Sequence, residues 1–271
     1  MANSYSAPNF NLDTSCAASD LAGIKGSAVA TSDYIYLYNG MTFDFDQNLS
    51  FAGWFLGDNS AKNSATKRAY ITNSATGITI TLNTNTTHEG MDGVGTTSTV
   101  TLIGTAANPI TITCVNAGKA SNSHSGGNLH TLKHVNFNDL YLFYHKAQHF
   151  LKNCKFTATG SALLYGYYCD ANSGATLPAC LDGCEFVNMN AAIYDVRTAV
   201  PVDWVDFFAK NEIKLTANSP ATNQVNAIIF RFGTGATGLT RYIRFETSTT
   251  SMKNKYRKGM KGVAGAGLGL K

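Results

Sequence analysis

The chain has 271 residues and a formal net charge of +4, and only 14% of its residues are charged, well below the usual share in soluble domains. Gly, Ser, Thr, Asn and Ala dominate the rest, and the long Ala/Leu/Glu/Lys stretches of helical proteins are absent, so composition favours β structure with little helix. No run approaches the roughly 18 apolar residues of a membrane-spanning helix, and the first residues lack a basic leader before an apolar core. We therefore expect one domain with tails, with no membrane span and no general secretion signal.

The first part of the chain contains short runs in which β-branched or aromatic residues alternate with polar ones. Strict alternation indicates strands with one buried and one wet face. These strands are either early coils of a solenoid or a cap sheet that covers its aggregation-prone open end. The predicted strands span residues 34–38, 49–55, 69–73, 77–83, 98–104 and 110–114.

A repeat of the form apolar-x-x-Cys/Val-x-Phe follows. Its clear copies start at Leu132, Leu151 and Leu181, and weaker copies start at Phe208 and Thr240, with steps of 19, 30, 27 and 32 residues. Second apolar runs follow the first four copies, at residues 140–145, 162–169, 191–196 and 227–230.

A unit this short cannot bury its apolar face alone, so successive copies must stack into a solenoid. Stacking places equivalent residues one above another at about 4.8 Å. We expect Cys154 to lie over Cys184 and Phe156 over Phe186, all facing inward, with the thiols reduced and unbonded.

The spacing and the Asn- and Gly-containing corners "KNC" and "DGC" resemble the right-handed parallel β-helix of the pectin-lyase-like superfamily. The resemblance implies three parallel sheets with a tight bend at Asn153 and Gly183, residue types that accept left-handed backbone angles. We therefore predict an all-β fold, a right-handed parallel β-helix over residues 98–246. An N-terminal β region (1–97, cap or first coils) precedes it, and a flexible basic arm (247–271) follows. Enzymes, adhesins and virus particle proteins share this architecture, so it does not specify function.

The 17 carboxylates offer few candidates for catalysis, although glycoside hydrolysis generally needs two at a defined separation. Asp44 and Asp46 alternate onto one strand face, and Asp203 and Asp206 lie near Arg197 on an apparent loop. Solvated surface charge is the simpler interpretation, because the motifs of pectin hydrolases and lyases are absent. We predict no catalytic set, and Asp203, Asp206 and Arg197 are the candidates if the chain is an enzyme.

Histidines and cysteines raise the question of a metal. On one straight strand His130 and His134 would be about 13 Å apart, although stacking of coils could bring either near His149. A zinc site at Cys180 and Cys184 would need two further convergent ligands. We predict no metal and no cofactor. The histidines considered are His124, His130, His134, His145 and His149, and the remaining cysteines are Cys16, Cys114, Cys154 and Cys169.

Tyrosine-rich runs at residues 141–144 and 165–168 could stack against sugar rings. Tyrosine is also a favourable strand residue, and we favour packing. The glycine-rich segments 233–238 and 265–269 lack the strand-to-helix context of a phosphate-binding loop.

The basic character is concentrated at the C-terminus. Residues 241–271 carry eight Lys or Arg against one Glu, whereas residues 1–240 carry 13 basic and 16 acidic residues. Such an arm binds an acidic surface through long-range attraction, or it is only a solubilising tail. Few aromatics accompany it, which argues against nucleic acid. The predicted partner-binding residues are Lys253, Lys255, Arg257, Lys258 and Lys261.

A low-charge β-solenoid with no recognisable catalytic set and a basic arm resembles bacteriophage virion components, among which β-helical trimers recur. The resemblance implies a capsid decoration, cement or fibre-like protein that docks on a shell through its tails. Its partners would be a major capsid or other virion protein and two further copies in a homotrimer, with no membrane partner. It would be made in the host cytoplasm and released by lysis within the virion. The alternatives are a polysaccharide-degrading tailspike-type lyase or hydrolase, and an extracellular adhesin, with a cell-surface polysaccharide as partner.

Overall fold

The computed structural model shows an all-β chain, as predicted. Its only helices within the described residues are the 3-10 helix η1 (Ala18–Asp20) and the short α1 (Leu21–Lys25). The described residues are 3–38, 40–57, 69–83, 91–94, 99–115, 121–123, 129–140, 142–144, 148–158, 165–169, 180–187, 189, 191–195, 212–214, 225–232 and 239–245.

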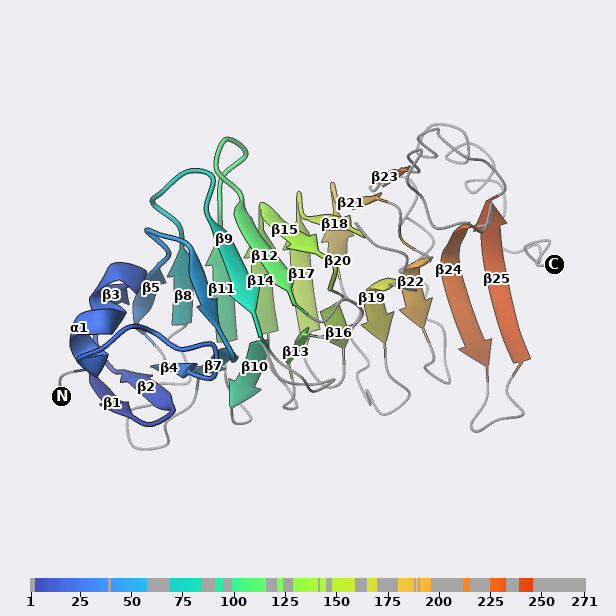
Figure 1. Cartoon of the computed structure of the whole chain (residues 1–271). Helices are drawn as coiled ribbons and strands as arrows, with labels where there is room; N and C mark the ends of the chain where they lie inside the picture. The colour runs from blue at the N-terminus through green and yellow to red at the C-terminus, as the bar shows by residue number, and fades with distance from the viewer. Residues whose placement is uncertain are drawn as a thin grey trace.

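The strands form four sheets (Figure 1). Sheet A contains β1 (Ser4–Ser6), β2 (Asn9–Leu12), β4 (Tyr34–Tyr38), β7 (Gly53–Gly57) and β10 (Met91–Val94). Sheet B contains β3 (Cys16–Ala17), β5 (Thr42–Asp44), β8 (Ala69–Thr72), β11 (Thr99–Ile103), β14 (Leu129–Lys133), β17 (Gln148–Lys152) and β20 (Cys180–Asp182). Sheet C contains β6 (Leu49–Phe51), β9 (Thr79–Leu82), β12 (Ile110–Cys114), β15 (Val135–Asn138), β18 (Lys155–Thr157), β21 (Glu185–Val187) and β23 (Glu212–Lys214). Sheet D contains β13 (Ser121–Ser123), β16 (Leu142–Tyr144), β19 (Tyr165–Cys169), β22 (Ala191–Asp195), β24 (Val225–Phe232) and β25 (Leu239–Phe245).

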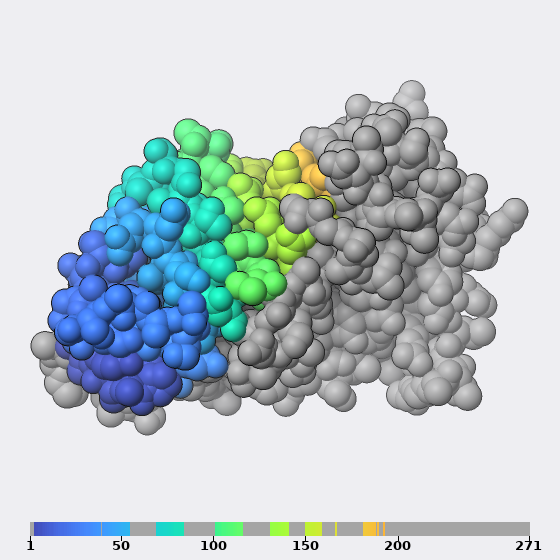
Figure 2. All heavy atoms as spheres, in the orientation of Figure 1, coloured from blue at the N-terminus to red at the C-terminus, as the bar shows by residue number. Residues whose placement is uncertain are grey.

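The chain visits the sheets in rotation, and each strand pairs in parallel with the equivalent strand of the next coil. Thus β8 pairs with β11, β11 with β14 and β14 with β17. Strands β10 and β13 pack beside each other, so sheet D continues the wall that sheet A begins. This arrangement is a β-solenoid consistent with a parallel β-helix, and its coloured coils form a continuous close-packed body in Figure 2.

Parallel pairing begins at β2 and β4 and also links residues on either side of position 97, through β8 with β11 and β9 with β12. The predicted strands 34–38 and 110–114 coincide with β4 and β12. The predicted strand 49–55 is instead two strands, β6 and β7. Ala52 is buried directly after buried Phe51, which breaks the alternation and marks a corner between two walls. The domain boundaries predicted at 97/98 and 246/247 stay predictions.

The last two strands do not follow the parallel pattern, because β25 pairs antiparallel with β24. The repeat copy predicted to start at Thr240 is therefore wrong. Its Ile243 pairs with Ile228 in sheet D and does not continue the Phe186 to Ile213 column of sheet C. Only six residues separate β24 from β25 in the sequence, which suits an antiparallel connection and is too short for a parallel crossover.

Aromatic stacking in the core confirms the predicted ladder. Phe137, Phe156 and Phe186 occupy successive rungs and are fully buried. The Phe137 and Phe156 ring centroids are 4.9 Å apart at 20°, and those of Phe156 and Phe186 are 4.9 Å apart at 3°. Ile112 and Ile80 continue the column toward the N-terminus.

The two predicted cysteine rungs are buried and free of disulfides. The Cys154 thiol donates to the Leu132 carbonyl at 3.5 Å, and the Cys184 thiol donates to the Leu151 carbonyl at 3.7 Å. The hydrogen bond with Cys154, together with burial, raises the pKa of Cys184 well above its ordinary value, so this thiol stays protonated. Both cysteines act as small buried apolar groups.

Left-handed residues turn the chain from sheet B to sheet C, as predicted for Asn153 (φ 53°) and Gly183 (φ 66°). His134 occupies the equivalent corner one coil earlier, with φ 51°. The corners are bonded to one another, since the Asn153 N–H donates to the Asp182 carbonyl at 2.8 Å and the His134 N–H donates to the Lys152 carbonyl at 3.1 Å.

At the N-terminal end, η1 and α1 follow sheet B strand β3 (Figure 1). Ala18 and Leu21 from these helices are fully buried in the core, and β1 pairs antiparallel with β2. In the described part of the chain, no helix is long and apolar enough to span a membrane.

Candidate functional site

The candidates for catalysis and docking predicted from sequence lie outside the described residues. They are Asp203, Asp206 and Arg197 for catalysis, and Lys253, Lys255, Arg257, Lys258 and Lys261 for docking. The described residues do place the other polar side chains that the sequence singled out.

Asp44 and Asp46 lie on one side of the chain, because Phe43 and Phe45 between and beside them are buried. They contact different coils. Asp44 accepts hydrogen bonds from Thr72 (2.8 Å) and from the Ser74 hydroxyl. Its neighbour Asp46 accepts from the backbone N–H of Ser19 at 3.0 Å and from the hydroxyl of the same residue.

Hydrogen bonding from the Ser19 hydroxyl holds the pKa of Asp46 below its ordinary value, with the Ser19 N–H adding to the effect. A general acid needs the opposite shift near neutral pH. Since Asp44 bonds to a later coil and Asp46 to an earlier segment, the two carboxylates do not converge on one substrate position. Each carboxylate instead forms hydrogen bonds that join its own strand region to a neighbouring segment of the solenoid.

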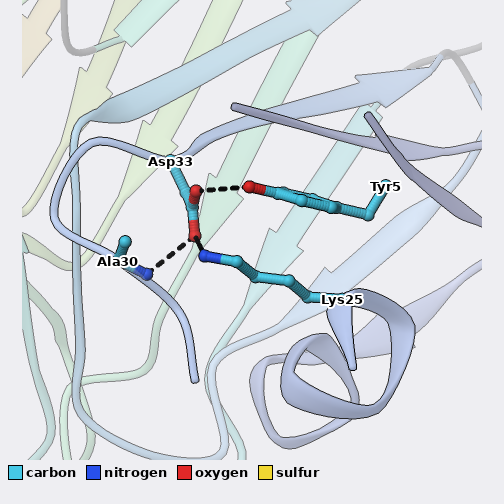
Figure 3. A network of polar contacts seen from close by, with 4 residues as sticks. All are labelled: Tyr5, Lys25, Ala30 and Asp33. Carbon is cyan, nitrogen blue, oxygen red and sulfur yellow. Dashed lines mark hydrogen bonds and ion pairs between the residues drawn. The ribbon is translucent and has the colours of Figure 1, made fainter. Parts of the chain in front are cut away.

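A buried carboxylate with three hydrogen-bond donors, which the sequence did not reveal, lies at the N-terminal end (Figure 3). Asp33 Oδ2 accepts from Lys25 Nζ at 2.7 Å and from the Ala30 N–H at 2.7 Å, and its Oδ1 accepts from the Tyr5 hydroxyl at 3.0 Å. The Lys25 ammonium also lies 5.1 Å from the Tyr5 ring centroid, a cation–π distance. We call Tyr5, Lys25, Ala30 and Asp33 the N-terminal clasp.

The ion pair of the clasp is largely buried, since the side chains of Lys25 and Asp33 are 12% and 2% exposed. Burial opposes ionisation of Asp33, but the hydrogen bonds from Lys25, Ala30 and Tyr5 outweigh it, and the pKa of Asp33 lies below its ordinary value. The hydrogen bond to Asp33 raises the pKa of Lys25. Both groups therefore stay charged near neutral pH, and the clasp ties β1 and α1 to the first coils.

Later carboxylates also join adjacent coils. Lys155 and Glu185 are 3.0 Å apart, and Lys152 and Asp182 are 3.9 Å apart. Each pair occupies directly opposed positions on neighbouring rungs. These partly exposed pairs contribute little energy individually, but they place opposite charges on neighbouring rungs.

Side-chain amides make the same kind of contact. The Asn108 amide donates to the Asn73 carbonyl at 3.3 Å and to the Ala75 carbonyl at 2.9 Å, and the Asn73 amide donates back to the Asn108 carbonyl at 3.4 Å. On the next wall, the Asn83 amide donates to the Ser50 hydroxyl at 2.7 Å. The asparagine-rich composition thus contributes bonds from coil to coil.

The histidines do not form the straight-strand arrangement that the sequence suggested. Because His134 is a corner residue, the expected separation of His130 and His134 along one strand does not apply. Register instead opposes His130 to His149 on neighbouring coils, which is the stacking that the sequence left open. Among the described residues, no group of three or more His, Cys, Asp and Glu side chains is placed to hold a metal. His124 and His145 lie outside those residues.

The outer face of sheet B carries exposed aromatic side chains. Tyr70 and Phe150 are 40% and 39% exposed, and register places them in one column with Thr101 and Thr131 on the two rungs between them. Thr101 is only 3% exposed, and its hydroxyl oxygen has no hydrogen-bond partner within the described part of the chain.

A second column runs beside it, in which Ile103, Lys133, Lys152 and Asp182 occupy successive rungs. This face could not be predicted from the sequence. The coils between Tyr70 and Phe150 differ in length, so no fixed spacing aligns the two residues. Residues 142–144 of the first tyrosine run form β16 and the second run lies in β19, whereas Tyr141 lies outside the described residues.

Comparison with known proteins does not add to this description: no protein-family model, no curated protein sequence and no solved structure matches the chain.

Proposed function

We propose that this chain is a structural protein of a bacteriophage virion, a capsid decoration, cement or fibre-like protein. The observation that carries the proposal is the use of its polar side chains. Asp33, Asp44, Asp46 and Glu185 are engaged in contacts between segments or coils. Carboxylates that join segments in this way stabilise the folded solenoid, which suits a structural protein of a particle.

The ladder core supports the same role. Stacked phenylalanines and buried thiols repeat from coil to coil, so the loss of one coil exposes the apolar rungs of the next. We infer that the solenoid is the right-handed parallel β-helix of the pectin-lyase-like superfamily and works as a homotrimer. In this proposal η1 and α1 cap its first coil, since an uncovered end is prone to aggregate.

Docking falls to the basic arm, residues 247–271. In this proposal Lys253, Lys255, Arg257, Lys258 and Lys261 meet acidic residues of a major capsid protein or another virion protein. The attraction should weaken as salt shortens the Debye length below about 8 Å.

The test is co-sedimentation of the purified chain with phage particles that lack it, at low and at high salt. We expect binding that falls with salt and is lost when residues 252–271 are deleted. Retention of the deleted chain with no salt dependence would contradict docking through the arm. Failure of the full chain to bind any particle would contradict the virion role.

A further inference from the structure

We propose that Cys154 and Cys184 form a redox site, in which a small-molecule disulfide such as glutathione disulfide closes a covalent bond between two coils of the solenoid. Both thiols are free in the structure, as suits a reducing cytoplasm. The site is complete on one chain. Only its meeting with an oxidant rests on the proposed function, because release by lysis moves the chain into oxidising surroundings.

The first argument is the register of the two cysteines. Lys155 and Glu185 lie directly opposite each other in β18 and β21, so the residues before them, Cys154 and Cys184, occupy adjacent rungs about 4.8 Å apart. The Glu185 N–H donates to the Cys154 carbonyl at 2.9 Å, which joins the two coils at this rung. A disulfide spans Cα separations of about 4.4–6.8 Å. The spacing of the ladder therefore lies within the range that a disulfide bridges.

The second argument is that the two thiols contact each other and no other cysteine is placed in this way. The thiols of Cys154 and Cys184 are hydrogen-bonded to each other. In the pairings of the described strands, none of the other four cysteines lies opposite a cysteine. Cys16 opposes Phe43, Cys114 opposes Leu82, Cys169 opposes Tyr144 and Asp195, and Cys180 opposes Phe150.

The burial of the pair determines when it reacts. Each cysteine is 1% exposed, and the hydrogen bond with Cys154, together with burial, raises the pKa of the Cys184 thiol. The thiolate is the form that attacks a disulfide, so the closed solenoid protects the pair. Oxidation therefore requires a local separation of the two coils, which costs less free energy than global unfolding. Denaturant below the unfolding transition should accelerate the reaction.

The reaction is a thiol–disulfide exchange in two steps. One cysteine thiolate attacks a sulfur of glutathione disulfide, so that a protein–glutathione disulfide forms and one glutathione thiolate leaves. The second cysteine thiolate then attacks the protein sulfur of that bond and releases the second glutathione thiolate. The two leaving groups take up the two protons that the cysteines lose. Both cysteines are oxidised, and the oxidant is reduced to two thiols.

The experiment incubates the full folded chain with glutathione disulfide, with and without urea below the unfolding transition, and then blocks the free thiols. Mass spectrometry of an unreduced digest identifies the linked peptides. We expect one dominant link, between Cys154 and Cys184, that forms faster in urea and is lost on reduction with dithiothreitol. Cys154→Ala and Cys184→Ala should each abolish it. Cys114→Ala is the matched control, since Cys114 is also buried but lies opposite Leu82, and it should leave the link unchanged.

Stability provides a second measurement. The link joins the coil of β17 and β18 to the coil of β20 and β21, so the midpoint of urea unfolding should rise after oxidation and return to its original value after reduction. Neither alanine variant of the pair should show this rise. Circular dichroism of the reduced variants shows that they are folded before the oxidant is added.

The proposal is overturned if no link forms, if glutathione stays attached to one cysteine of the pair, or if other cysteines link as often. A link that lowers the unfolding midpoint would show that the ladder does not accommodate it, and would also overturn the proposal. Particle binding is measured separately. A chain that closes the link but binds no particle retains the redox site and contradicts the virion role, whereas a chain that binds particles without closing the link contradicts the redox site alone.

Discussion

Replacing Phe156 by leucine should reveal how much the aromatic ladder contributes to stability. Phe156 is fully buried and stacks on two rings, Phe137 and Phe186, each at 4.9 Å. Leucine retains most of the apolar burial but removes both ring contacts. Each aromatic pair is worth about 0.5–1.5 kcal/mol beyond its area, so the two contacts account for about 1–3 kcal/mol. The change of shape adds up to about 1.5 kcal/mol.

Phe43→Leu is the matched control, because Phe43 is equally buried but makes one edge-on ring contact within the described residues, with Phe45 at 4.9 Å. The free energy of unfolding, measured by urea denaturation with circular dichroism, should fall by about 0.5–1.5 kcal/mol more for Phe156→Leu than for Phe43→Leu. Equal losses in the two variants would refute the inference that stacking from coil to coil stabilises the core.

Three further predictions concern the clasp, a corner and the acidic loop. Asp33 has a lowered pKa, so its contribution to stability is present above its unfolded pKa of about 3.9 and is lost as pH falls through the folded value. Asp33→Asn should destabilise the chain at pH 7 and flatten the decline in melting temperature below pH 4, and an unchanged acid profile would contradict the clasp. Gly183→Ala should cost about 1–2 kcal/mol, because its φ of +66° is unfavourable for alanine. Gly23→Ala should stabilise slightly, since a Cβ added at this position in α1 meets nothing within 4 Å. Urea denaturation of both variants decides, and equal effects would argue against strain at the corner. The double variant Asp203→Asn/Asp206→Asn should leave particle binding intact, while polysaccharide digestion that this variant abolishes would favour the enzyme alternative.

The repeat predicted the part of the fold in which coils are regular. Where copies share the same short corner, as at Asn153 and Gly183, equal spacing sets the register, so the cysteine and phenylalanine rungs could be read from the sequence. The corner at His134 was missed because residues 130–134 read as one straight strand, although the place of His134 in the repeat matches that of Asn153 and Gly183. The corner at Ala52 was hidden within an apolar run.

The contacts between distant segments could not be predicted in the same way. Tyr5 and Asp33 are 28 positions apart, and no periodic signal links them. Tyr70 and Phe150 lie on one column only because intervening coils of unequal length return the chain to the same wall. The reversal at β25 likewise depends on a short connection that a loose repeat does not encode.

The most direct test of the virion role is mass spectrometry combined with cryo-electron microscopy of native phage particles that carry the gene for this chain. The account predicts many regular copies on the particle, with density for a β-solenoid that matches the stacked sheets and a contact formed by the C-terminal arm. Particles that are complete without the chain, and a chain found only in the lysate, would contradict it.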